Sequence, residues 1–88
     1  MHMHYVYILK SLKDNNLYIG FTADLRKRFK EHNSGKTRST KSRVPFKLIY
    51  YEAYIDKKDA RKRELELKNN GQQREFLMKR IDNSLKES

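Results

Sequence analysis

The chain has 88 residues, of which 21 are Lys or Arg and 11 are Asp or Glu, so its formal net charge is +10. This length predicts one small domain with a single hydrophobic core, covering residues 1–88. The absence of cysteine excludes disulfide scaffolds, cysteine-ligated metal sites and thiol catalysis. No apolar run approaches the roughly 18 residues of a membrane span, and the first residues lack the apolar segment of a signal peptide. We therefore expect a cytoplasmic protein without a membrane partner.

Two strands joined by a turn are predicted at the start of the chain. Tyr5–Leu9 and Leu17–Phe21 are rich in aromatic and β-branched residues, which favour strands. The turn formers of Lys13–Asn16 lie between them. The pattern predicts an antiparallel β-hairpin in which side chains two residues apart share a face.

A helix and then a basic loop are expected after the hairpin. Thr22 or Asp24 can cap the helix, and Gly35 can end it with left-handed backbone. Its inward positions recur at helical spacing, at Leu25, Phe29 and His32. Lys36–Arg43 shows no periodicity and contains only basic residues, Ser and Thr, so we expect an exposed loop.

The second half of the chain predicts a third strand and two helices. Phe46–Ile55 alternates like a strand, with Leu48 expected on the same face as Tyr50, Glu52 and Tyr54, and opposite Ile49, Tyr51, Ala53 and Ile55. Asp56 can cap a helix that continues to about Lys68. A last helix is expected over about Gln72–Leu85, with an apolar stripe at Leu77, Met78, Ile81 and Leu85.

Positive charge is concentrated in the middle of the chain. Between Arg26 and Lys47 the only acid is Glu31, and the nine basic residues are Arg26, Lys27, Arg28, Lys30, Lys36, Arg38, Lys41, Arg43 and Lys47. Charge of one sign suits the phosphates of a nucleic acid. We expect the binding residues to be Lys27 and the loop residues Lys36, Arg38, Lys41 and Arg43; the alternative for the loop is a solubilising surface.

Arg28 and His32 are neighbours one helical turn apart, beside the apolar face that carries Leu25 and Phe29. An arginine at the edge of such a face can hold a phosphate with two parallel hydrogen bonds while the histidine handles a proton. The alternative is an arginine stem that lies along the core with the histidine packed beneath it.

Glu64 is expected on the inward side of its helix, between Ala60 and Leu67, whereas Glu66 falls on the outer side. A buried carboxylate is costly without a partner. Glu64 therefore either forms a structural ion pair with an arginine, such as Arg28, or holds a divalent cation. The pattern leaves both alternatives open.

Taken in order, these residues resemble the GIY-YIG nuclease family. The matching positions are Tyr5-Val6-Tyr7, Tyr18-Ile19-Gly20, Thr22, Asp24-Leu25, Arg28, His32-Asn33 and Gly35. The later stretch Ala60–Glu64, with Leu67-Lys68 behind it, resembles the glutamate helix of that family. The likeness runs from Tyr5 to about Asn83 and is greatest to small single-domain bacterial members, which are related to the nuclease domain of excision-repair endonucleases. Any hairpin can supply two tyrosine tripeptides, but their conjunction with Arg28, His32 and Glu64 is specific.

The resemblance implies an α+β fold: a three-stranded antiparallel sheet with the first strand central, flanked by helices. It implies an endonuclease that hydrolyses phosphodiester bonds in DNA, or alternatively RNA, with Mg²⁺ or Mn²⁺, and that is structure-specific and linked to repair or recombination. Glu64 would hold the metal, Arg28 would stabilise charge on the phosphate, and Tyr18 would act as the base or orient the attacking water. Tyr7 and His32 would assist.

Three positions depart from the family pattern. Tyr5 stands where the first motif has glycine, and Phe21 stands where the excision-repair relatives have lysine. Asn83 lies one position away from the register of the family's terminal asparagine. The alternative function is a basic nucleic-acid-binding module that uses the same fold without cutting. Retention of Tyr7, Tyr18, Arg28, His32 and Glu64 together favours the enzyme.

Overall fold

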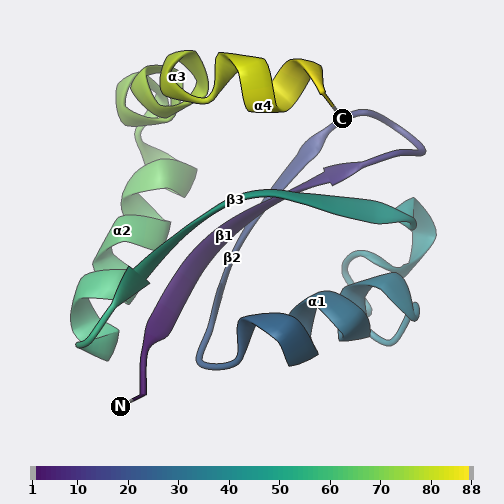
Figure 1. Cartoon of the computed structure of the whole chain (residues 1–88), viewed down its shortest axis with the longest axis horizontal. Coiled ribbons are helices and arrows are strands. Elements are labelled where there is room, and N and C mark those ends of the chain that lie inside the picture. Colours follow the sequence, from purple (N-terminus) through teal and green to yellow (C-terminus); the bar gives the residue numbers. More distant parts are fainter. Residues whose placement is uncertain (1, 88) are drawn as a thin grey trace.

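The structure is a computed structural model that describes residues 2–87 and contains one antiparallel sheet flanked by helices. In chain order the elements are β1 (His4–Ser11), β2 (Leu17–Thr22), α1 (Leu25–Asn33), the short 3₁₀ helix η1 (Lys41–Arg43), β3 (Phe46–Tyr54), α2 (Lys57–Asn69), α3 (Gly71–Arg80) and α4 (Asp82–Lys86). The strand order is β2-β1-β3, so the first strand is central (Figure 1). The predicted hairpin, third strand and α+β class are confirmed.

The helices begin where the sequence supplies capping side chains. Asp24 accepts a hydrogen bond from the Lys27 amide at the start of α1, and Asp56 does the same for the Lys58 amide at the start of α2. Each carboxylate satisfies one of the amides that a helix leaves free at its first turn. Of the two caps considered for α1, the structure uses Asp24. Gly35 follows the end of α1 with a φ of 75°, as predicted.

The central strand is buried on both faces because helices cover the sheet from both sides (Figure 1). On the face that packs against α2 and α3, Val6 and Ile8 join a cluster completed by Ala60, Leu67, Leu77 and Ile81. On the face toward α1, Tyr7 and Leu9 pack with Phe46. Side chains of β1 therefore alternate between two cores, which places Tyr7 on the α1 face.

The predicted alternation of β3 is wrong at one end because the strand contains a bulge. Ile8 pairs with Tyr50 and Leu9 pairs with Leu48, so Ile49 is an extra residue opposite β1. As a result Leu48 packs with the Tyr7 cluster, whereas Tyr50 packs on the other face with Ile49.

The predicted last helix is two helices. The chain leaves α3 at Ile81 and begins α4 at Asp82, and the buried Ile81 side chain joins the core at this break. The expected exposed loop is also more ordered than its composition indicates, because Lys41–Arg43 form η1 and Thr40 is fully buried. Within the described residues, no helix has the length and apolar character needed to cross a bilayer.

Candidate active site

The site is organised around the close approach of Tyr7 to Gly20. The two residues face each other in the β1–β2 ladder. The Tyr7 ring lies so near the Gly20 backbone that a Cβ atom at this position would overlap the Tyr7 hydroxyl and ring. Only glycine leaves room for the ring, which explains the glycine of the second tripeptide in structural terms.

Tyr7 is the first member of a buried chain of polar side chains. Its hydroxyl lies 2.8 Å from His32 Nε2, and His32 Nδ1 lies 2.8 Å from the Thr40 hydroxyl. Tyr7 is 1% exposed, and His32 and Thr40 are fully buried. These three hydrogen-bonded side chains connect β1, α1 and the loop before η1. Because both ring nitrogens of His32 have a partner, the orientation of the imidazole is fixed.

The electrostatic environment keeps the side chains of Tyr7 and His32 uncharged at neutral pH. Burial raises the pKa of Tyr7 to about 12, although interaction with the Arg28 guanidinium opposes this rise. Burial and then the Arg28 charge lower the pKa of His32 below its ordinary value. A protonated phenol and a neutral imidazole therefore face each other. Neither side chain reaches solvent, so neither is exposed to a molecule bound at the surface.

Tyr18 and Arg28 are the site residues that reach the surface. The Tyr18 ring is half-buried, with its centroid 5.0 Å from that of His32 and 6.4 Å from that of Tyr7. Among residues 2–87, the Tyr18 hydroxyl has no hydrogen-bond partner, so it is available to a bound molecule. Arg28 lies 3.4 Å from Glu31, and this ion pair is about one-third exposed. Its guanidinium therefore keeps donors available for an anion.

Glu64 is buried on α2, as expected, but its partners differ from the expected one. Its Oε1 lies 2.5 Å from Arg61 Nη1, and its Oε2 lies 2.8 Å from Lys68 Nζ. The ion pair with an arginine, one of the two alternatives, is therefore present, but the arginine is Arg61, and Arg28 contacts Glu31 instead. Glu64 and Arg28 both influence the pKa of Tyr7, so the carboxylate and the guanidinium both lie near this phenol.

Glu64 could serve as a single carboxylate ligand for a hard cation only if that cation replaced Arg61 and Lys68, which contact both carboxylate oxygens. The part of the chain that the structure describes contains no group of three or more His, Cys, Asp or Glu suited to a metal, so a site with several protein ligands is not built here. Mg²⁺ commonly binds through one or two carboxylates while water and phosphate oxygens fill its other positions. The side chains of Arg61 and Lys68 are 56% and 42% exposed, so both can move away from the carboxylate.

A cavity of about 600 Å³ lies beside the edge strand β2, next to this part of α2. It is lined by three consecutive residues of β2, among them Tyr18, and by Lys68 and Arg74 from the helices. Arg61, Lys68 and Arg74 were not among the predicted site residues. The spacing of Arg61 and Lys68 from Glu64, three and four residues along one helix, was a usable signal for these two.

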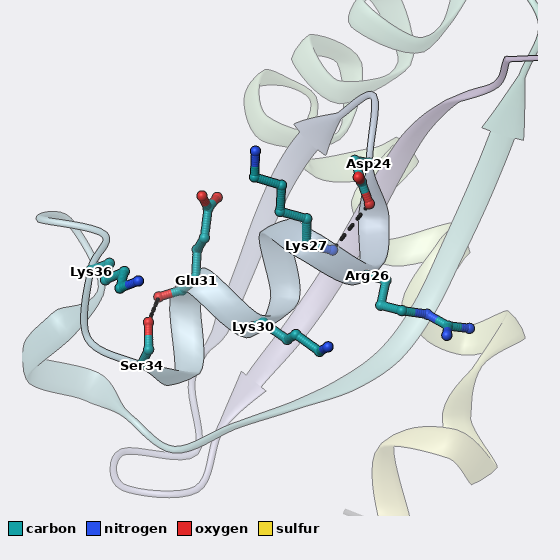
Figure 2. Close-up of a pocket in the computed structure, with 7 residues that line it drawn as sticks. All are labelled: Asp24, Arg26, Lys27, Lys30, Glu31, Ser34 and Lys36. Atoms are coloured by element: carbon teal, nitrogen blue, oxygen red, sulfur yellow. Dashed lines mark hydrogen bonds between the residues drawn. The ribbon is translucent and has the colours of Figure 1, made fainter.

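Four of the predicted nucleic-acid-binding residues are exposed, and the fifth, Arg43, is held in an ion pair. Lys27 and Lys36 line a cavity of about 450 Å³ on the outer side of α1, with Arg26 and Lys30 (Figure 2). Arg38 and Lys41 are exposed in the following loop. Arg43 differs: it pairs with Asp14 at 2.8 Å and lies over the Phe46 ring, so this guanidinium fastens the loop to the hairpin.

A family of nuclease domains fits this arrangement of two tyrosines, an arginine, a histidine and a glutamate on a three-stranded sheet. The chain matches the model of the GIY-YIG catalytic domain over residues 3–79. It therefore belongs to the GIY-YIG family.

Similar proteins include UPF0213 proteins of bacteria. One from Staphylococcus haemolyticus is 43% identical over 79 residues, which cover 89% of this chain and 95% of that protein. One from Streptococcus pneumoniae is 40% identical over 87 residues, covering 96% and 87% of the two chains. The solution NMR structure of a UPF0213 protein from Bacillus halodurans matches with a TM-score of 0.55 and 39% identity, covering 88% of this chain and 83% of that one. The matches therefore span most of this chain and most of each of these relatives.

Proposed function

We propose that this protein is a divalent-metal-dependent endonuclease that hydrolyses phosphodiester bonds in DNA. Membership of a nuclease-domain family supports a nucleic acid as substrate. The single observation that carries the proposal is the placement of Tyr18, Arg28 and Glu64 around the buried pair of Tyr7 and His32. A module that only bound nucleic acid would not require an inward carboxylate or a phenol held against a buried histidine.

In this proposal each group of the site has a separate task. Arg28 is suited to bind a phosphate oxygen pair and to stabilise the charge that develops on the phosphoryl group. The partly exposed Tyr18 can orient the attacking water with its hydroxyl or, as the phenolate, accept a proton from that water. A bound Mg²⁺ or Mn²⁺ would supply Lewis-acid stabilisation of the phosphate, and Glu64 would be its protein ligand. Tyr7, His32 and Thr40 hold Tyr18 and Arg28 in place.

The basic surface of α1 and the following loop supports a polyanionic substrate. Lys27, Lys36, Arg38 and Lys41 present positive charge to solvent, and such contacts position a nucleic acid without reading its sequence. We extend the proposal to cutting that depends on DNA structure, in repair or recombination. A panel of labelled flaps, junctions, duplexes and single strands, incubated with Mg²⁺ or EDTA, tests this extension.

The decisive variant is Glu64→Gln, which preserves volume and removes the anionic ligand. We expect cleavage to be lost while nucleic-acid binding in EDTA and the melting temperature stay close to those of the wild type. Glu66→Gln is the matched control, since it makes the same charge change two residues along α2, where Glu66 pairs with Arg63. If Glu64→Gln unfolds the protein or cuts normally, the glutamate is a structural ion-pair partner and the metal assignment is wrong. Binding without cutting by the wild type under any metal would establish the non-catalytic alternative.

A further inference from the structure

A second cavity, of about 470 Å³, opens on the same face of the sheet as Tyr7, between α1 and β3. We call it the aromatic groove. Its aromatic lining residues are Tyr5, Phe29 and Tyr51. The rings of Tyr5 and Tyr51 meet edge to face with centroids 5.9 Å apart. Tyr51 is 53% exposed although it is a large side chain in a strand, so one side of its ring is open to solvent.

The aromatic groove adjoins the candidate active site. Tyr51 is the direct partner of Tyr7 in the β1–β3 ladder, and Tyr7 in turn faces Gly20 of β2. Neighbouring strands lie about 4.8 Å apart, so the backbones of Tyr51 and Tyr7 are adjacent, although the Tyr7 ring lies on the β2 side, over Gly20. The aromatic groove and the candidate site therefore lie on the same face of the sheet, and a single strand several nucleotides long could contact both.

The charge around the aromatic groove complements a phosphate backbone. Arg26 lines the groove, and Lys30 follows it one helical turn later; Figure 2 shows both side chains leaving α1 on the same side. Asp24 is the one acid at the groove, and its carboxylate is occupied in capping α1. An open aromatic ring flanked by cations is the combination that binds unpaired nucleotides, because each base stacks and each phosphate meets a positive charge.

We propose that the aromatic groove binds an unpaired base of a DNA single strand, which stacks on Tyr51 while Arg26 and Lys30 contact the adjoining phosphates. This proposal rests on the proposed function for the identity of its ligand. It adds that the substrate must carry at least one unpaired nucleotide near the bond that is cut. In a continuous duplex the base would have to leave its stack to reach the ring.

The test measures affinity in EDTA by fluorescence anisotropy, with labelled oligo-dT and with a blunt duplex of the same length. Tyr51→Ala should weaken single-strand binding between about 5-fold and 150-fold, which corresponds to the usual stacking contribution of one base. It should leave duplex binding nearly unchanged. Tyr51→Phe should bind like the wild type, because the ring remains. Phe76→Ala is the matched control, since Phe76 is 54% exposed but lies on α3.

A second measurement locates the base. A set of oligonucleotides, each with one abasic position, should show a single position at which the wild type loses affinity, and Tyr51→Ala should lose that position dependence. Equal binding of wild type and Tyr51→Ala, or an equal loss for single strand and duplex, would overturn the proposal. So would a wild-type dimer that Tyr51→Ala dissociates in sedimentation experiments. If the Tyr51 signature holds but no DNA is ever cut, the proposed function fails and this inference stands.

Discussion

Substitution of Gly20 by alanine tests whether the close approach of Tyr7 holds the site together. The new Cβ would overlap the hydroxyl and ring of Tyr7, which is 1% exposed and hydrogen-bonded to His32, so the ring cannot move aside freely. Overpacking of this kind costs about 1–3 kcal/mol. If the ring also leaves His32, the unpartnered imidazole nitrogen adds a cost of about 1–3 kcal/mol. For a domain of this size each kcal/mol lowers the melting temperature by about 4–8 °C.

Circular dichroism would follow the melting temperature of Gly20→Ala, and NMR titration would follow the His32 imidazole. We expect the pKa of His32 to rise toward its ordinary value, because displacement of Tyr7 admits water to the ring. Gly71→Ala is the control: Gly71 begins α3, and its Cβ would meet only the Arg74 guanidinium at 3.7 Å. The reasoning would be refuted if the free energy of unfolding of Gly20→Ala lay within about 0.5 kcal/mol of the wild-type value and the His32 titration were unchanged.

Three further variants test other contacts. Burial alone would raise the pKa of Glu52, but hydrogen bonds from Arg63 and two tyrosines outweigh it and lower this pKa. Ionised Glu52 should therefore stabilise the fold fully above about pH 4.3 and lose this contribution as pH falls through its lowered pKa, and Glu52→Gln should flatten the acid side of a stability profile. Arg28→Lys should reduce single-turnover cleavage more than affinity, since an ammonium cannot form two parallel hydrogen bonds; normal turnover would show that the side chain only packs. Thr40→Val should cost about 1–3 kcal/mol in urea unfolding by leaving His32 Nδ1 unpartnered, and unchanged unfolding would show that the bond contributes nothing.

The elements that the sequence predicted well are those with local signals. Alternating side chains and turn formers defined the hairpin, and Asp24 and Asp56 defined the starts of α1 and α2. The bulge at Ile49 has no such signal, because it exists only in the pairing of β3 with β1. The end of α3 at Ile81 was missed for a related reason: the apolar stripe continues through the break. Periodicity alone does not distinguish one helix from two.

The candidate site shows the same division. Tyr7 and Tyr18 follow from the hairpin, and Arg28 and His32 follow from helical spacing, so their proximity could be predicted. The predicted inward position of Glu64 on α2 is confirmed. Its arginine partner is Arg61 rather than Arg28, because cations three and four residues away on the same helix reach the carboxylate. The burial of Thr40 could not be predicted, since a loop without periodicity gives no indication of which hydroxyl turns inward.

Because Thr40 contacts His32, the basic loop over Lys36–Arg43 helps to hold the buried side chains of the site in position. The loop that carries Arg38 and Lys41 toward solvent also holds the imidazole through the Thr40 hydroxyl, 2.8 Å from His32 Nδ1. Any opening of this loop would release His32 and, through it, Tyr7. A polyanion that binds the loop and restricts its motion therefore also restricts the motion of the site. The affinity of the loop for a polyanion and the order of His32 and Tyr7 therefore both depend on how often the loop opens. Hydrogen exchange in α1 and in the loop should slow together when DNA binds.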